Sequence, residues 1–196
     1  LYIACDKGHV DAARLLLDKG AEVDRADEDG RTPLFVACFK GHVGAARLLL
    51  DKGADVNRAV KNWTPLYVAC LAGHVDVAQL LLERSAEVDR AEEDGRTPLY
   101  IACQYGHVDA ALLLLDNGAA IDQTKEDGAT PLYIACQKGH VEAVRLLLEK
   151  GAEVDWALDG RTLLYAACQN GHVDAARLLL CLLYTSPGPR DSDSSR

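Results

Sequence analysis

Six cysteines and six histidines recur at fixed places along the chain, and a thiol with an imidazole could form a nucleophile and its base. Cys38 and His42, for example, are four residues apart. However, Gly41 interrupts the helix between them, and no copy of the pair differs from the others as a catalytic copy should. We therefore predict that the chain is not an enzyme and that the histidines have a structural role in a turn. The recurring residues are Cys5, Cys38, Cys70, Cys103, Cys136 and Cys168, with His9, His42, His74, His107, His140 and His172.

The recurring cysteines predict neither a disulfide nor a metal site. Stacked helices lie about 8–10 Å apart, whereas the Cα atoms of a disulfide are at most about 7 Å apart. A tyrosine or phenylalanine stands three places before each of these cysteines, beginning with Tyr2 in the first copy. No Cys-x-x-Cys pair and no zinc spacing therefore occurs. We predict small core residues without metal or cofactor. Free thiols favour a reducing, intracellular compartment.

Acidic turns are the other group that could bind a ligand. The runs 27–30 and 92–95, Asp-Glu-Asp-Gly and Glu-Glu-Asp-Gly, resemble part of a calcium-binding EF-hand loop. In the first run, the first and twelfth ligand positions fall on Arg25 and Val36, so too few oxygen ligands are present. We predict solvated hairpin tips that could meet a basic partner.

These residues recur because the chain is built from repeats. Threonine opens a Thr-Pro-Leu-aromatic tetrad, with leucine in place of proline in the last copy, at intervals of 32 or 33 residues. The threonine suits the N-cap of a short helix, and the proline suits its first position. A glycine such as Gly106 then ends that helix, and alanines and leucines give the next helix an apolar side. The threonines are Thr32, Thr64, Thr97, Thr130 and Thr162.

The pattern T-P-L-x-x-A, G-H-V, L-L-L, G-A-x-V-D resembles the ankyrin repeat over residues 1–180. The resemblance implies an all-α repeat solenoid of paired antiparallel helices joined by β-hairpin-like loops. It implies about six units, the first and last truncated, and a partner held on the concave face by hairpin tips and first helices. The units are residues 1–28, 29–60, 61–93, 94–126, 127–158 and 159–180.

Several residues depart from the ankyrin pattern. Tyrosine or phenylalanine, as at Tyr67, stands where the family commonly has histidine, and we expect aromatic packing there. Ser85 occupies a position that is otherwise glycine, which predicts a left-handed backbone at a cost of about 1 kcal/mol. The hairpins at 61–63 and 158–160 are one residue short, and Asn62 can replace glycine there because asparagine tolerates positive φ.

Residues 181–196 do not continue the repeat. They begin C-L-L-Y-T-S-P-G-P-R and end in serine and aspartate. One interpretation is a natural disordered tail; the other is a non-native tail that resembles translated sequencing-adaptor DNA. The chain starts with Leu1 and contains no methionine. We predict a fragment of a longer array with a disordered, non-native tail.

The net charge of −9 and the pI of about 5.1 favour a protein partner of basic character and disfavour nucleic acid. No run approaches the roughly 18–20 apolar residues that span a bilayer, and no signal peptide is visible. We predict an intracellular, cytoplasmic protein without a membrane segment or a small-molecule substrate. Targeting signals could lie in missing termini.

Recognition must use the residues that vary between repeats, because the recurring residues build the scaffold. The outliers in first helices and hairpins include exposed aromatic candidates, which are enriched in binding hot spots. An alternative is that the two tryptophans only cover the shortened hairpins. The predicted partner-binding residues are Phe39, Lys40, Val60, Trp63, Leu71, Tyr105 and Trp156.

Asn57 carries a narrower resemblance. Its surroundings are similar to the hairpin asparagine that an intracellular asparaginyl hydroxylase modifies in many ankyrin proteins. The alternative interpretation is an asparagine that stabilises a turn.

We predict a non-catalytic protein–protein interaction scaffold. The alternative is a spacer or targeting segment of a larger multidomain enzyme whose catalytic domain is absent from this sequence. A third hypothesis, a stand-alone hydrolase that uses cysteine and histidine, requires one thiol far more reactive than the rest.

Overall fold

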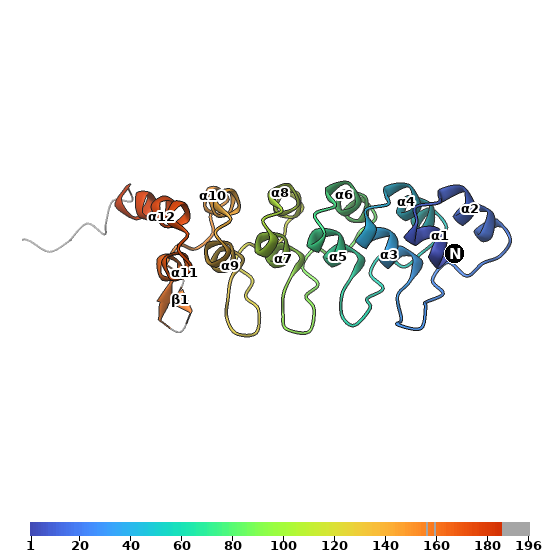
Figure 1. Cartoon of the computed structure of the whole chain (residues 1–196), viewed down its shortest axis with the longest axis horizontal. Coiled ribbons are helices and arrows are strands. Elements are labelled where there is room, and N and C mark those ends of the chain that lie inside the picture. The colour runs from blue at the N-terminus through green and yellow to red at the C-terminus, as the bar shows by residue number, and fades with distance from the viewer. Residues whose placement is uncertain (156, 159, 186–196) are drawn as a thin grey trace, which may run out of the picture.

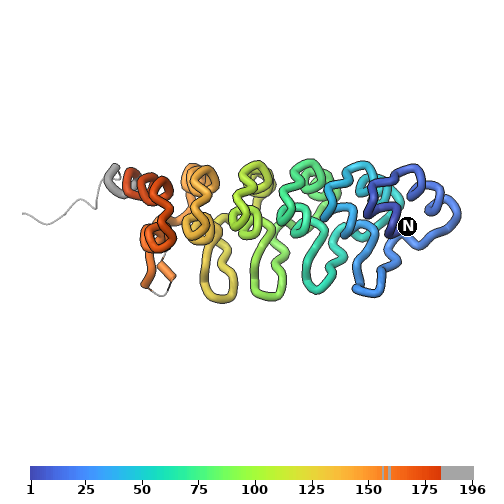
Figure 2. The backbone as a smooth tube through the Cα atoms, in the orientation of Figure 1, coloured from blue at the N-terminus to red at the C-terminus, as the bar shows by residue number. Residues whose placement is uncertain are grey.

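In the computed structural model, which describes residues 1–155, 157–158 and 160–185, helices run in two parallel rows (Figure 1). Each repeat adds one helix to each row, and a hairpin loop projects from the side of the first helices (Figure 2). The predicted all-α repeat solenoid is confirmed. The first helices are α1 (Tyr2–Asp6), α3 (Pro33–Lys40), α5 (Pro65–Leu71), α7 (Pro98–Tyr105), α9 (Pro131–Lys138) and α11 (Leu163–Gln169). The second helices are α2 (Val10–Asp18), α4 (Val43–Asp51), α6 (Val75–Glu83), α8 (Val108–Asp116), α10 (Val141–Glu149) and α12 (Val173–Thr185).

Threonine caps five of the first helices, as predicted. In each, the hydroxyl oxygen accepts a hydrogen bond from the backbone N–H three residues later, at 3.0–3.2 Å. This bond satisfies an amide that has no partner within the helix. Gly106 ends α7 at φ 72°, in the left-handed region that glycine adopts without strain. Both ends of these short helices are therefore encoded locally.

We expect Thr97→Ala to lower the free energy of unfolding by about 1 kcal/mol, because the Tyr100 amide then loses its buried partner. Urea denaturation followed by circular dichroism measures the change. Thr97→Ser is the matched control, because serine keeps the capping oxygen. An equal loss in both variants would contradict the capping role.

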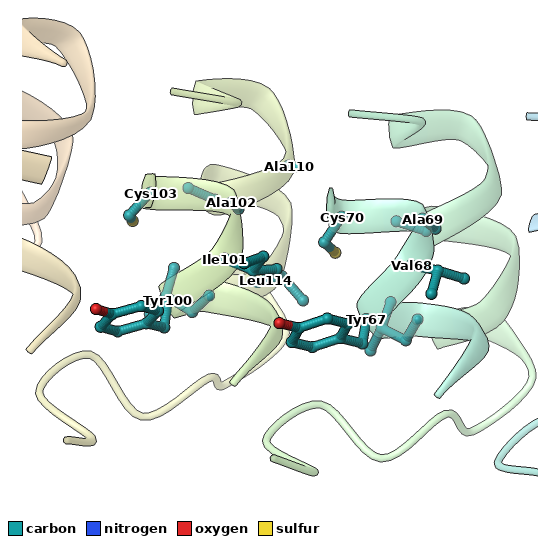
Figure 3. Close-up of a cluster of buried hydrophobic side chains, with 14 of the residues drawn as sticks. Tyr67, Val68, Ala69, Cys70, Tyr100, Ile101, Ala102, Cys103, Ala110 and Leu114 are labelled. Carbon is teal, nitrogen blue, oxygen red and sulfur yellow. The ribbon is translucent and has the colours of Figure 1, made fainter. Parts of the chain in front are cut away.

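The core lies between consecutive repeats and is built mainly from alanine, leucine and the tetrad aromatics. Figure 3 shows Tyr67 and Cys70 on the side of α5 that faces α7, and Tyr100 and Cys103 one repeat further along. Both tyrosines are almost fully buried, so the expected aromatic packing is confirmed for them. Alanines in the second helices, such as Ala110, are also fully buried. Small side chains of this kind let neighbouring helices approach closely.

Cys168 is the exception among the recurring cysteines. The other five are buried, as predicted, but Cys168 is exposed. The equivalent cysteines face the next repeat, and no further repeat follows α11 and α12 in the part of the chain that the structure describes. The prediction of a core role is therefore wrong for this residue.

The shortened hairpin of the third repeat is a two-residue turn. Val60 and Trp63 exchange two backbone hydrogen bonds of 3.0 Å. Lys61 (φ 49°) and Asn62 (φ 65°) lie between them in the left-handed region, which is typical of a type I′ turn. Asn62 thus adopts the predicted conformation. In the last repeat, strand β1 (Ala157–Leu158) pairs antiparallel with β2 (Arg161–Thr162).

Ser85 also has the predicted left-handed backbone, at φ 65°. Helix α12 continues to Thr185, five residues beyond the predicted limit of the last repeat at residue 180. The Gly-Ala pair that follows four of the other second helices is replaced here by apolar residues that extend the helix. Residues 186–196, which belong to the predicted tail, lie outside the described residues.

Candidate protein-binding surface

The histidines of the Gly-His-Val triplets link each repeat to the one before it. In five of them, Nε2 donates a hydrogen bond to a backbone carbonyl near the end of the preceding first helix, at 3.0–3.2 Å. A carbonyl can only accept, so this bond fixes the proton on Nε2. The structural role is confirmed, but the partner lies outside the turn. The pairs are His42 with Asp6, His74 with Phe39, His107 with Leu71, His140 with Gln104, and His172 with Gln137.

The buried cysteines are poor nucleophiles. Burial raises the pKa of Cys5 to about 11 and those of Cys70 and Cys136 to about 12, and it also raises the pKa of Cys38 and Cys103. The reactive form of cysteine is the thiolate, which these residues do not form near neutral pH. Among the described residues, no group of three or more His, Cys, Asp and Glu side chains could hold a metal ion. The five buried thiols are therefore unsuited to nucleophilic chemistry.

Glu92 corrects the expectation of solvated acidic tips. Its side chain is buried and accepts hydrogen bonds from Arg96 Nε at 2.8 Å and from the Asp94 and Arg96 amides at 3.1 and 3.3 Å. Burial alone raises the pKa of Glu92, but these hydrogen bonds and the Arg96 charge outweigh burial and hold the pKa below its usual value. The carboxylate therefore holds its own hairpin together. Asp27 and Arg31 make the same pair at 2.9 Å in the second repeat.

Because the pKa of Glu92 is lowered in the fold, its contribution to stability is present above the unfolded-state pKa of about 4.3 and is lost as pH falls through the folded-state value. Glu92→Gln replaces charge-assisted hydrogen bonds with neutral ones. We expect a loss of about 1 kcal/mol at pH 7 that shrinks as the pH falls below about 4.3 and Glu92 becomes protonated. Urea denaturation of both proteins across this range measures the difference. A difference that does not change with pH would contradict the assignment.

Asn57 connects two consecutive hairpin loops. Its side-chain oxygen accepts a hydrogen bond from the Glu87 amide of the next repeat, at 3.0 Å. Aspartates at the equivalent positions make the same cross-repeat bond, as Asp24 does with the Asp55 amide at 3.1 Å. The stabilising role extends beyond a single turn, which the sequence did not indicate. Hydroxylation of Asn57 stays a prediction.

Four of the predicted binding residues line one hollow of about 580 Å³ that is formed by residues of the first three repeats. Phe39 is 41% exposed, and Lys40 Nζ lies 5.7 Å from the centre of its ring. The Trp63 ring is partly buried and packs against Tyr67, with the ring centres 5.6 Å apart. Val60 contributes little surface, because it is only 8% exposed. We call this hollow the aromatic hollow.

Two other predicted residues, Tyr105 and Leu71, do not line the aromatic hollow. Tyr105 is 51% exposed and stacks on His107, with ring centres 6.3 Å apart. Leu71 is partly buried against the core, and its carbonyl accepts the His107 hydrogen bond. Trp156 lies outside the described residues.

The family model described as "Ankyrin repeats (3 copies)" matches the chain three times, over residues 1–60, 57–125 and 117–191. This chain belongs to the ankyrin repeat family. The crystal structure of the human ASB11 ankyrin repeat domain is similar to it, with a TM-score of 0.85 and 34% sequence identity over 92% of this chain and 81% of that one. No curated protein sequence matches the chain.

Ankyrin repeats are generally protein–protein interaction modules, so the broad class of role follows from the family. None of the ankyrin helices among the described residues has the length and apolar character needed to cross a membrane. The aromatic hollow is lined in part by residues that do not recur between the ankyrin repeats, such as Phe39 and Trp63.

Proposed function

We propose that this chain is a non-catalytic scaffold that holds a partner protein on the concave face, against the first helices and hairpin loops. The aromatic hollow carries this proposal. Phe39 is a large apolar side chain left exposed beside a cavity, and aromatic anchors in pockets dominate the energy of many interfaces. A spacer that only separates other domains has no need of such a hollow.

Two features of the hollow suit recognition. First, the Val60–Trp63 turn is one residue shorter than its neighbours, and Trp63 stands where the second and fourth repeats have Arg31 and Arg96. Second, the tryptophan ring is held in place by Tyr67, so little conformational entropy is lost when a ligand contacts it. The hollow thus combines an apolar wall with a fixed shape.

The buried thiols and the net charge bear on the cell compartment and on the class of partner. Five buried free thiols suit a reducing interior, and we propose an intracellular location. The net charge of −9 opposes binding to nucleic acid. For the molecule as a whole, this net charge also favours a basic partner. The charges beside the hollow differ from this average.

We expect Phe39→Ala and Trp63→Ala each to weaken capture of the natural partner by tenfold or more, because a truncated hot-spot residue costs about 2 kcal/mol or more. Affinity capture from cell extract, with quantitative mass spectrometry, measures the loss. Leu112→Ala on the outer helix α8 is the matched control, since that side chain is 37% exposed and far from the hollow. Unchanged capture with unchanged melting in both variants would reject the proposal.

A further inference from the structure

A second hollow, of about 410 Å³, lies three repeats further along the same face. Tyr100, Tyr133 and Leu158 line it, and they occupy the same repeat positions as Tyr2, Phe35 and Val60 in the aromatic hollow. Each hollow lies beside a different one of the two shortened hairpins. The shortened hairpins therefore come with a pair of equivalent cavities.

The two hollows differ in polarity. Gln137 takes the place of Phe39, and Arg161 takes the place of Trp63. The first hollow therefore offers an apolar anchor point, whereas the second offers an amide and a guanidinium. We call the second one the polar hollow.

Among the residues that the structure describes, basic side chains outnumber carboxylates in the lining of both hollows. Arg31 and Lys125 are neutralised by aspartates of their own hairpins, at 2.8 and 2.6 Å. The remaining basic lining residues make no ion pair with any residue that the structure describes. They are Lys40 and Lys61 in the aromatic hollow, and Lys138 and Arg161 in the polar hollow.

The charges that line the hollows act on a bound ligand more strongly than the net charge of the whole chain does. Interactions between exposed charges are largely screened beyond about 8 Å at physiological ionic strength. A ligand seated in the hollows meets the lysines and arginine directly, together with three lining carboxylates, whereas the other carboxylates of the chain lie outside the lining. The three are Asp6, Asp29 and Asp127, and each forms an ion pair with a basic residue. The expectation of a basic partner, drawn from the whole chain, does not apply to this face.

We infer that the two hollows bind one extended, acidic segment of the partner protein, with an apolar side chain in the aromatic hollow and a carboxylate in the polar hollow. The inference rests on the proposed function and specifies its ligand. Stacked helices about 8–10 Å apart place the hollows about 24–30 Å apart. At about 3.3 Å per residue, an extended chain spans this distance in roughly seven to nine residues.

The probes are fluorescent peptides of twelve residues that carry one Leu, Phe or Trp and, six to ten residues later, a Glu-Glu pair. Matched peptides carry Lys-Lys at the same place, or Ala in place of the apolar anchor. Fluorescence anisotropy with the full chain measures the affinity of each. We expect the tightest acidic peptides to bind at least tenfold better than both matched peptides. If no acidic peptide in the set binds more tightly than its matched peptides, the inference is overturned.

The variant Lys138→Glu/Arg161→Glu tests the polar hollow directly. We expect it to weaken the acidic peptides at least tenfold and to reverse the preference towards the basic ones. The control Lys19→Glu/Arg47→Glu makes the same charge change on exposed residues at the second helices α2 and α4, and should leave the preference intact. Equal effects of the two pairs would mean that overall charge, not the hollow, decides.

The outcomes also separate this inference from the proposed function. If Phe39→Ala weakens capture of the natural partner but charge reversal in the polar hollow does not, the scaffold function stands and the acidic segment is rejected. If neither change affects capture, both are rejected.

Discussion

Leu114→Ala is expected to lower the free energy of unfolding by about 2–5 kcal/mol, because it leaves a cavity at a fully buried position in the middle of the array. Helix α8 packs against α7 of its own repeat and against α6 and α10 of the neighbouring repeats. Each repeat is stabilised by such neighbour contacts, so weakening the fourth repeat uncouples those on either side. Urea denaturation should show a loss of stability and a broader or divided transition.

Leu112→Ala is the matched control for this prediction. It makes the same change two residues away on the same helix, where the side chain is 37% exposed. We expect a loss of less than about 1 kcal/mol and a single transition like that of the unmodified chain. Similar losses in the two variants would contradict the placement of the core between repeats.

Gly106→Ala is expected to lower the free energy of unfolding by about 2–4 kcal/mol, for two reasons. The backbone at φ 72° costs a non-glycine residue about 1 kcal/mol. In addition, a Cβ atom there would lie 2.6 Å from Nδ1 of His140, and this overpacking costs roughly 1–3 kcal/mol. The histidine must then move, which strains its 3.0 Å hydrogen bond to the Gln104 carbonyl.

Gly171→Ala separates the two contributions. Gly171 has the same place in the Gly-His-Val triplet and a similar φ of 74°, but apart from its chain neighbours no atom of the described residues lies within 4 Å of the added Cβ. We expect it to lose only the backbone contribution, about 1 kcal/mol. A loss as large as that of Gly106→Ala would show that the imidazole contact has no energetic importance.

Features encoded within a few residues could be predicted from the sequence. The threonine caps and the left-handed backbones of Asn62 and Ser85 depend on neighbours at most four positions away, and the structure shows all of them. The repeat period predicted the solenoid, because units that cannot bury an apolar face alone must stack. The burial of five cysteines followed from the same stacking.

Bonds between repeats could not be predicted from one unit. The partners of His107 and Asn57 lie 36 and 30 residues away, so local turn chemistry did not indicate them. A polar residue stands at each of these two positions in successive units, and this recurrence was the available signal, because it suggests a contact between units. Glu92 was misjudged for another reason: its hydrogen bonds to Arg96 require the hairpin to fold back over the carboxylate.

The candidate site was only partly predictable. Variation between repeats pointed to Phe39 and Trp63, and the structure brings both to one hollow. The same reasoning grouped Tyr105 with them, yet that ring stacks on His107 of its own repeat, outside the hollow. Sequence variation marks residues that are free to differ, but only the stacking geometry determines which of them share a cavity.

Site-specific photo-crosslinking tests the central claim, that a partner protein binds the face of the aromatic hollow. A benzoylphenylalanine is placed at Phe39 in one variant and at Leu112, on the outer helix, in another. The account predicts that the Phe39 variant crosslinks one partner in cells, that unlabelled chain competes for it, and that the Leu112 variant does not crosslink it. Crosslinking of that partner from Leu112 alone would contradict the account.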